Sequence, residues 1–225
     1  MGAVSSPCLV TNPVDELYDY DELRRRGDAT MFVLRVGSTT LVLGGNQSRD
    51  ILDDEAVSSM QLRRRRGGGG LVVLQPGDLW IDWWVPAHDP RWRPDVRVSS
   101  INAGHWWRQV LTGRISDVPV VHEGGLEGDH VLRVVCFTGR GPGEVFVGDR
   151  KAVGLTQWRV REGVFISTVL HAQPSQIALS VLREPPDGLE GALAHHTVSS
   201  LGIVEPQSLV DDLAVVSGPW VLRAL

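Results

Sequence analysis

An unbroken run of four arginines, residues 63–66, leads directly into four glycines, residues 67–70, and then into an apolar, β-branched segment. Arginine guanidinium groups donate paired hydrogen bonds to carboxylate or phosphate oxygens. Glycines let a backbone approach a ligand closely and turn its N–H groups toward it. The spacing matches neither a P-loop nor a dinucleotide-binding fingerprint. The run therefore predicts an anion-binding loop of another kind, and the alternative is a solvated charge run beside a mobile turn.

A lysine and a cysteine lie farther along the chain in apolar surroundings. Lys151 follows a predicted hairpin turn at Gly148 and Asp149, between two strand-like runs. A fixed ammonium group can stabilise negative charge that develops on a reacting oxygen. Cys136 precedes the same hairpin and is a candidate nucleophile, because a nearby cation favours the thiolate. The alternative for Cys136 is an inert thiol in a buried strand.

Two motifs in this order resemble the catalytic domain of lipoate-protein ligases and their relatives, the octanoyltransferases and biotin-protein ligases. The first motif is a pair of arginines, two spacers and a glycine triplet that opens a strand. It falls on Arg64 and Arg65, followed by Gly68, Gly69 and Gly70. The second motif is a hairpin turn that ends in G-[RK]-K-x-x-G-x-x-Q. It falls on residues 148–157, with one extra residue before the basic pair.

A third stretch, LVLGGNQ, resembles the G-R-x-Q-N motif of this family, with Gly44 and Gln47 in place. The three motifs agree in order and separation, so the resemblance covers residues 31–171. It implies one catalytic domain over residues 1–225, of the biotinyl/lipoyl-transferase type, without an accessory C-terminal domain. The fold class that it implies is α+β, with a mixed, mostly antiparallel sheet and flanking helices.

The resemblance implies an enzyme of the protein lipoylation pathway. A lipoate-protein ligase activates lipoate or octanoate with ATP to an acyl-adenylate and transfers the acyl group to a lysine of a carrier. ATP and Mg²⁺ would then be co-substrates, and phosphate oxygens would hold most of the metal's coordination sites. No tightly bound protein metal is expected. The implied partner is an apo-lipoyl domain or a glycine-cleavage H-type carrier protein.

The resemblance also implies roles for individual residues. Lys151 would be catalytic, orienting the acyl carboxylate and neutralising the developing oxyanion. The backbone of residues 68–70 would lie along the acyl-phosphate portion, and Arg64 or Arg65 would pair with the phosphate. The other residues expected to bind substrate or adenylate are Gln47, Val72, Val153 and Gly154, with the two valines lining an apolar tunnel for the acyl chain.

Five positions depart from the family pattern. Gly45 stands where the family has arginine, Gly67 replaces a serine or threonine, and Leu74 replaces a histidine. Ser167 and Thr168 occupy the positions of a histidine–glycine pair. Three activities therefore stay open: the ATP-dependent ligase, an ATP-independent octanoyltransferase that carries the acyl chain as a thioester on Cys136, and a non-catalytic homologue that binds a lipoyl domain or ligand without turnover.

Composition narrows the class of protein. The chain has 225 residues, a net charge of -5 and a pI of about 5.8, so binding to nucleic acid is not expected. The two cysteines, Cys8 and Cys136, have no metal-ligand spacing. The sequence shows no secretory signal and no apolar run long enough to span a membrane, which favours a cytoplasmic protein.

Residue patterns predict helices interspersed with hairpins, which favours an α+β fold. Helices are expected over residues 14–26, 50–61, 98–114, 189–204 and 208–216. Residues 31–36 and 39–45 are expected to pair as strands, and residues 70–75 and 78–85 to form a hairpin whose tryptophans occupy both faces of a strand. Further strands are expected over residues 118–123, 130–139, 144–160 and 163–172.

Overall fold

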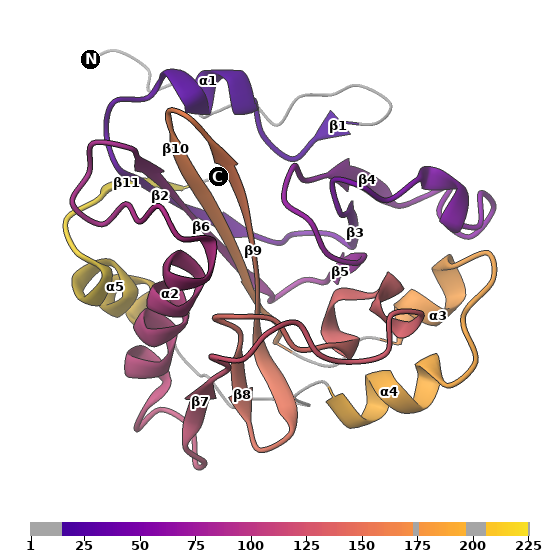
Figure 1. The fold of residues 1–225 in the computed structure, drawn as a ribbon. Coiled ribbons are helices and arrows are strands. Elements are labelled where there is room, and N and C mark those ends of the chain that lie inside the picture. Colours follow the sequence, from indigo (N-terminus) through magenta and orange to yellow (C-terminus); the bar gives the residue numbers. More distant parts are fainter. Residues whose placement is uncertain (1–14, 173–175, 197–205, 225) are drawn as a thin grey trace.

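The computed structural model describes residues 15–172, 176–196 and 206–224, which form two β-sheets with helices on their outer faces (Figure 1). The larger sheet has the strand order β11-β2-β6-β10-β9-β8-β7, and only the β11–β2 pairing is parallel. This mostly antiparallel sheet confirms the predicted α+β class. Its strands are β2 (Thr30–Arg35), β6 (Leu79–Pro86), β7 (Pro119–Val121), β8 (Val145–Val147), β9 (Arg150–Val160), β10 (Gly163–Leu170) and β11 (Val221–Ala224).

The smaller sheet contains the first two residues of the arginine run, Arg63 and Arg64, in its inner strand β4. Its order is β1-β4-β3-β5, with parallel pairing of β4 to both of its neighbours and antiparallel pairing of β3 to β5. The strands are β1 (Asp15–Glu16), β3 (Thr40–Leu43), β4 (Gln61–Arg64) and β5 (Val72–Leu74). The glycines form the connection from β4 to β5, so both ends of the glycine loop are anchored in this sheet.

The helices cover the outer sides of the two sheets. α2 (Val96–Leu111) and α5 (Pro206–Ser217) pack on one face of the larger sheet, and α3 (Ile177–Val181) and α4 (Leu189–His196) lie beside the smaller one (Figure 1). α1 (Tyr20–Arg25) follows β1. Short 3-10 helices occupy Arg49–Ile51, Leu132–Val134 and Cys136–Thr138. No helix in the described ranges is long and apolar enough to cross a membrane.

Strand β6 shows how the core is divided. Trp83 packs into the cluster beneath α2 and α5, whereas Trp80 and Trp84 pack into the cluster between the two sheets. Successive side chains of a strand point to opposite faces, so one strand feeds both clusters. The expected placement of these tryptophans on both faces is confirmed.

Two predicted strand pairings are wrong. β2 pairs with β6 and β11, whereas β3 pairs with β4 and β5. β5 and β6, expected as a hairpin, also belong to different sheets. Short turns between apolar strands are typical of hairpins. Here each turn instead carries the chain from one sheet to the other, because the strands gain burial between layers.

Two predicted elements are also wrong. Residues 50–61 do not form a helix: Ser48 caps only the short 3-10 helix, and the Asp53 carboxylate accepts N–H groups from Glu55 and Ala56 at 3.0 and 2.9 Å. Serine and aspartate side chains compete in this way with helical hydrogen bonds. Residues 130–139 form two 3-10 helices rather than a strand.

The remaining predicted helices are found, with different ends. α1 begins after its N-cap, Asp19, and is therefore shorter than residues 14–26. α2 begins two residues before the predicted start and ends at Leu111. α5 covers the predicted residues 208–216, and α4 accounts for residues 189–196 of the predicted 189–204. The rest of that range, residues 197–204, lies outside the described residues.

A buried carboxyl group on β6 makes the stability of this fold sensitive to pH. Asp82 is fully buried, and the hydroxyl of Tyr18 donates a hydrogen bond to it. Burial raises the pKa of Asp82 from 3.8 to about 7. The folded state therefore holds this proton more tightly than the unfolded chain does. The free energy of unfolding is expected to fall as pH rises from about 4 to about 7, and to lose up to about 4 kcal/mol at this site.

Asp82→Asn tests this expectation, because an amide of the same shape does not ionise. Urea unfolding at pH 5 and pH 8 should show a much smaller loss of stability for the variant than for the wild-type chain. Asp28→Asn, a change at an exposed aspartate, serves as the control. Parallel pH profiles for Asp82→Asn and the wild type would contradict the assignment.

Candidate functional site

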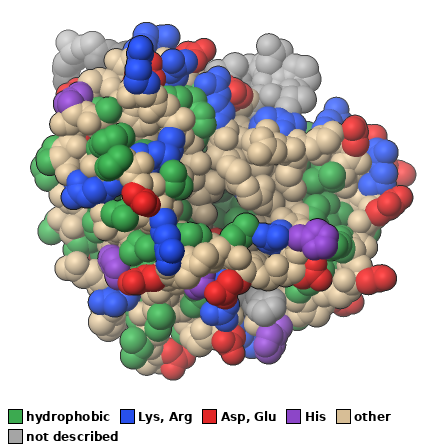
Figure 2. Space-filling model, viewed as in Figure 1, with side chains coloured by type: hydrophobic (Ala, Val, Ile, Leu, Met, Phe, Trp, Pro, Cys, Tyr) green, Lys and Arg blue, Asp and Glu red, His purple; other side chains and the backbone are tan. Residues whose placement is uncertain are grey.

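A pocket of about 660 Å³ opens between the start of α2, the glycine loop and strand β9. Figure 2 shows a hollow near the middle of this face of the molecule. The pocket walls combine backbone, apolar and charged groups. The residues that line it include Gly68, Gly69, Gly70, Val96, Arg97, Leu126, Arg133, Val135, Cys136, Arg140, Glu144, Lys151 and Leu155.

The structure brings Lys151 and the glycine triplet together. Both line the same pocket, although 80 residues lie between Gly70 and Lys151 in the sequence. Lys151 is the only lysine of the sequence, and its side chain is 1% exposed. Its ammonium Nζ donates to the backbone oxygen of Cys136 at 2.8 Å and to the carboxylate of Glu144 at 2.8 Å. A single, buried cation is thereby fixed in the wall of the pocket.

The conformation of the glycine loop follows from its inward-facing carbonyl groups. Gly69 has a φ of 91°, a region that favours glycine. The Gly68 oxygen accepts from the Arg65 guanidinium at 2.9 Å and from the Thr156 hydroxyl at 3.0 Å. The Gly70 oxygen accepts from Arg65 at 2.7 Å. These contacts satisfy two carbonyl groups of the loop and fix its path along the pocket.

Arg65 is therefore not placed as the predicted phosphate ligand. Its side chain is buried, and a third hydrogen bond runs to the Val42 oxygen at 3.2 Å. Burial lowers the pKa of the Arg65 guanidinium from its usual value. All of its described hydrogen-bond partners are backbone oxygens of β3 and the glycine loop. Arg65 braces the loop from behind.

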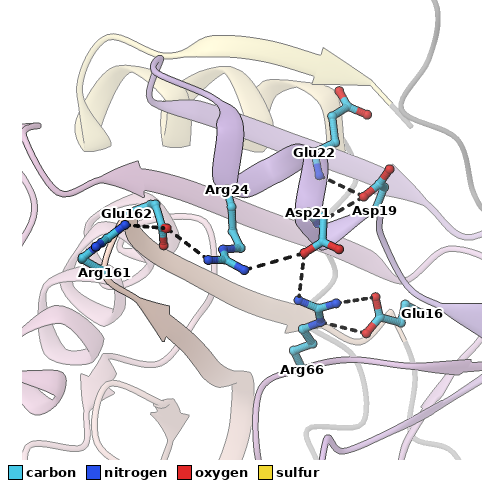
Figure 3. A network of polar contacts seen from close by, with 8 residues as sticks. All are labelled: Glu16, Asp19, Asp21, Glu22, Arg24, Arg66, Arg161 and Glu162. Carbon is cyan, nitrogen blue, oxygen red and sulfur yellow. Dashed lines mark hydrogen bonds and ion pairs between the residues drawn. The ribbon is translucent and has the colours of Figure 1, made fainter.

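The neighbouring arginines also contact protein groups rather than the pocket. Arg64 donates to the backbone oxygens of Gln47 and Gly44. Arg66 pairs with the Glu16 carboxylate at 2.7 Å and with Asp21 at 3.7 Å, and these contacts tie the glycine loop to the segment around α1 (Figure 3). In this structure Arg64, Arg65 and Arg66 contact protein groups and support the loop, and anion binding by Arg64 or Arg65 stays a prediction.

The other predicted binding residues lie outside this pocket. Gln47 accepts from the Gly44 N–H and donates to the Val134 oxygen, both at 2.9 Å, so it joins two loops. Val72 and Val153 are buried in the core, which leaves the predicted acyl tunnel without its two valines. Gly154 lies against the ring of Phe137, where an added Cβ would be 3.0 Å from a ring carbon.

Cys136 lines the pocket and is partly exposed. Burial raises the pKa of its thiol above the usual value, and Lys151 opposes this rise only in part. The thiolate form that a nucleophile needs is therefore disfavoured. Cys136 therefore lies in the pocket, but its surroundings do not favour the charged thiolate.

Sequence reasoning missed the acidic and arginine residues of the pocket. Glu144 lies at the base of the wall beside Lys151, with its side chain 5% exposed. Arg97, Arg133 and Arg140 approach the pocket from α2 and the segment between β7 and β8. A lone acidic residue seven positions before the lysine was the available signal for Glu144. The arginines carry no motif, because only the tertiary fold gathers them.

Two departures from the family pattern have a structural cause. A Cβ atom at Gly45 would lie 2.6 Å from the Arg66 oxygen, so the backbone leaves no room there for the family's arginine. Leu74 is fully buried in the apolar cluster between the sheets, where a histidine would place polar ring nitrogens among apolar side chains. Ser167 and Thr168 are buried within β10.

The sheets and this pocket define a lipoate-protein ligase type of catalytic fold, which confirms the resemblance at the level of fold. A bi-partite lipoate protein ligase from Thermoplasma acidophilum, solved with its E2 lipoyl domain, aligns with a TM-score of 0.65 at 16% identity over 92% of this chain and 80% of that one. Lipoate-protein ligase A bound with ATP aligns with a TM-score of 0.63 at 16% identity, over 92% and 82%. P. falciparum LipL1 in complex with lipoate aligns with a TM-score of 0.57 at 10% identity, over 87% and 53%.

No protein-family model and no curated protein sequence matches the chain. The likeness to these structures therefore lies in the backbone arrangement.

Proposed function

We propose that this protein is a lipoate-protein ligase-like enzyme, which activates lipoate or octanoate with ATP to an acyl-adenylate and transfers the acyl group to a lysine of a carrier domain. The observation that carries the proposal is the meeting of Lys151 and the glycine loop in one pocket of a ligase-type fold. Ligases of this fold are known with ATP and with lipoate as ligands.

Lys151 is the proposed catalytic residue. Both half-reactions build negative charge on oxygen, first when the acyl carboxylate attacks phosphorus and then when an amine attacks the acyl carbonyl. An ammonium held in place before the reaction stabilises such charge without reorganisation, typically by about 3 kcal/mol. Because Lys151 is buried in the pocket wall, its charge acts through less water than a surface charge does.

The pocket arginines take over the role that the sequence assigned to Arg64 and Arg65. Arg97, Arg133 and Arg140 line the pocket and make it favourable for the phosphate groups of ATP. Arg140 pairs with Asp149, which is 80% exposed, and such a surface pair is weak enough to exchange for a phosphate. Mg²⁺ would accompany ATP and be coordinated mainly by phosphate oxygens, as is usual for this ion.

The acyl chain needs an apolar surface beside Lys151. Val135 and Leu155 line the pocket from its inner wall, and Val96 and Leu126 line it near solvent. These residues replace Val72 and Val153 as the proposed contacts of the chain. A saturated or dithiolane-bearing chain of eight carbons suits such a surface, because its burial is driven by apolar area.

The proposed acceptor is an apo-lipoyl domain, with an H-type carrier protein as the second candidate. The T. acidophilum ligase, which shares this fold, has been solved with its E2 lipoyl domain. The decisive assay combines the protein, ATP, Mg²⁺ and radiolabelled octanoate or lipoate with each apo-carrier. Labelled carrier supports the proposal. If acyl-adenylate forms but the carrier stays unlabelled, the activation step is supported and the transfer step is refuted. If neither product forms while the ligand still binds, the non-catalytic alternative is favoured.

Cys136 supports the second candidate function, an octanoyltransferase that needs no ATP. For a ligase, Cys136→Ser is expected to retain most acyl transfer, within about threefold of wild type, because the raised pKa of the thiol disfavours the thiolate that would attack an acyl group. The assay is run with octanoate plus ATP and, separately, with octanoyl-loaded acyl-carrier protein without ATP. Transfer that occurs only in the second mixture, and disappears in Cys136→Ser, would move the protein to the octanoyltransferase class.

A further inference from the structure

The buried neighbour of Lys151 is a carboxylate that the ligase reaction itself does not call for. Both oxygens of Glu144 lie 2.8 Å from the Lys151 Nζ, and the two side chains are 5% and 1% exposed. The second hydrogen bond of the ammonium runs to the Cys136 oxygen. The ammonium of Lys151 is therefore held by two protein groups, a carboxylate and a backbone oxygen.

A buried ammonium without a counter-charge tends to lose its proton, because burial disfavours the charged form. Glu144 supplies the counter-charge. Removal of either partner would leave the other as an unpaired buried charge, which is strongly unfavourable. Burial raises the pKa of Glu144, and the Lys151 ammonium opposes that rise. The Cys136 thiol lies close enough to Lys151, Glu144 and Arg65 to interact with them electrostatically. Arg133 and Arg140 line the same pocket.

The position of Glu144 is fixed by its backbone surroundings. The Gly141 backbone N–H donates to the Glu144 carboxylate at 2.6 Å. The backbone oxygen of Glu144 accepts from the His122 backbone N–H at 2.8 Å. Gly143 has a φ of 84°, and an added Cβ there would lie 2.1 Å from the Ser100 oxygen of α2. Helix α2 thus packs directly on the turn that presents Glu144, which leaves the carboxylate little freedom.

We propose that Glu144 is a positioning residue that supplies the buried counter-charge of Lys151 and holds its ammonium in the wall of the pocket. Its role in acyl transfer rests on the proposed function, whereas its effect on Lys151 does not. Phe137 and Phe146 support the same placement, since their ring centroids lie 5.4 and 6.0 Å from the Lys151 Nζ. Without Glu144, these rings and the Cys136 oxygen alone would hold the cation.

The test uses the fact that Lys151 is the only lysine of the sequence. Protein labelled with ¹³C at the lysine Cε gives one lysine signal, whose chemical shift and line width report the surroundings of the ammonium without any activity assay. In Glu144→Gln, this signal is expected to shift and broaden at neutral pH, because the ammonium loses the partner that fixes its position. Glu123→Gln removes an exposed carboxylate and is expected to leave the signal unchanged. An unchanged lysine signal in Glu144→Gln would overturn the proposal.

Acyl transfer supplies a second readout. In Glu144→Gln, kcat is expected to fall about tenfold or more with a smaller change in KM, because the ammonium is no longer held in place. Glu144→Asp keeps the charge but shortens the side chain, so kcat is expected to fall about tenfold or more through displacement of the ammonium. An unchanged kcat in Glu144→Asp would contradict the positioning role. A changed lysine signal in Glu144→Gln, together with no transfer by the wild type on any carrier, would refute the proposed function and leave the positioning role standing.

Discussion

Lys151→Ala is expected to lower acyl transfer by about 10²- to 10³-fold or more, because it removes the one ammonium that faces the glycine loop. The substitution also leaves Glu144 as a buried carboxylate without its partner, and burial will then favour the protonated acid. The measurement is kcat/KM for transfer of octanoate to an apo-lipoyl domain. Calorimetric titration with a non-hydrolysable acyl-adenylate analogue shows separately how much binding survives.

Arg150→Ala is the matched control for this variant. Arg150 is the neighbour of Lys151 on β9, is exposed, and points to the opposite face of the strand. It removes a cation of the same charge without altering the pocket, so transfer should stay within about twofold of wild type. Lys151→Arg separates charge from shape: a larger, planar guanidinium in the same buried space should restore little of the lost activity. Substantial transfer by Lys151→Ala would exclude Lys151 as the catalytic group.

The parts of the site that sequence reasoning located are those encoded by local spacing. Lys151 follows a turn whose Gly148 has a φ of 58°, and the turn fixes where the lysine sits on its hairpin. The glycine triplet likewise precedes its strand directly. α2 was predicted from a 3.6-residue periodicity, which Trp107 and Val110 confirm by facing the core. Such patterns need only a few neighbouring residues to be recognised.

The parts that sequence reasoning did not locate depend on contacts between distant segments. The sheet pairings failed because β3 and β5 are apolar on both faces, and a pattern of burial alone does not say which strand lies beside which. The contacts that the arginines make within the protein could not be predicted for a related reason. Four identical residues in a row gave no sign of which would be buried, and the partners of Arg65 and Arg66 come from β3, the glycine loop and Glu16.

The buried position of Arg65 changes what its substitution should do. A surface arginine that binds phosphate can be replaced by alanine with little loss of stability. Arg65 is 1% exposed and donates to the oxygens of Val42, Gly68 and Gly70. Alanine would leave these oxygens short of donors and leave a cavity behind the loop. Each buried oxygen that loses its only donor costs about 1–3 kcal/mol.

We therefore expect Arg65→Ala to lower the free energy of unfolding by about 3 kcal/mol or more, as measured by urea unfolding. Arg66→Ala is the matched control. Its side chain is 29% exposed and its pair with Glu16 is partly solvated, so its loss should cost about 1 kcal/mol or less. Arg65→Lys should recover only part of the stability, because an ammonium does not reproduce the fork that spans these carbonyl groups. If Arg65→Ala were as stable as Arg66→Ala but lost affinity for the acyl-adenylate analogue, Arg65 would be a phosphate ligand after all, and its bracing role would be refuted.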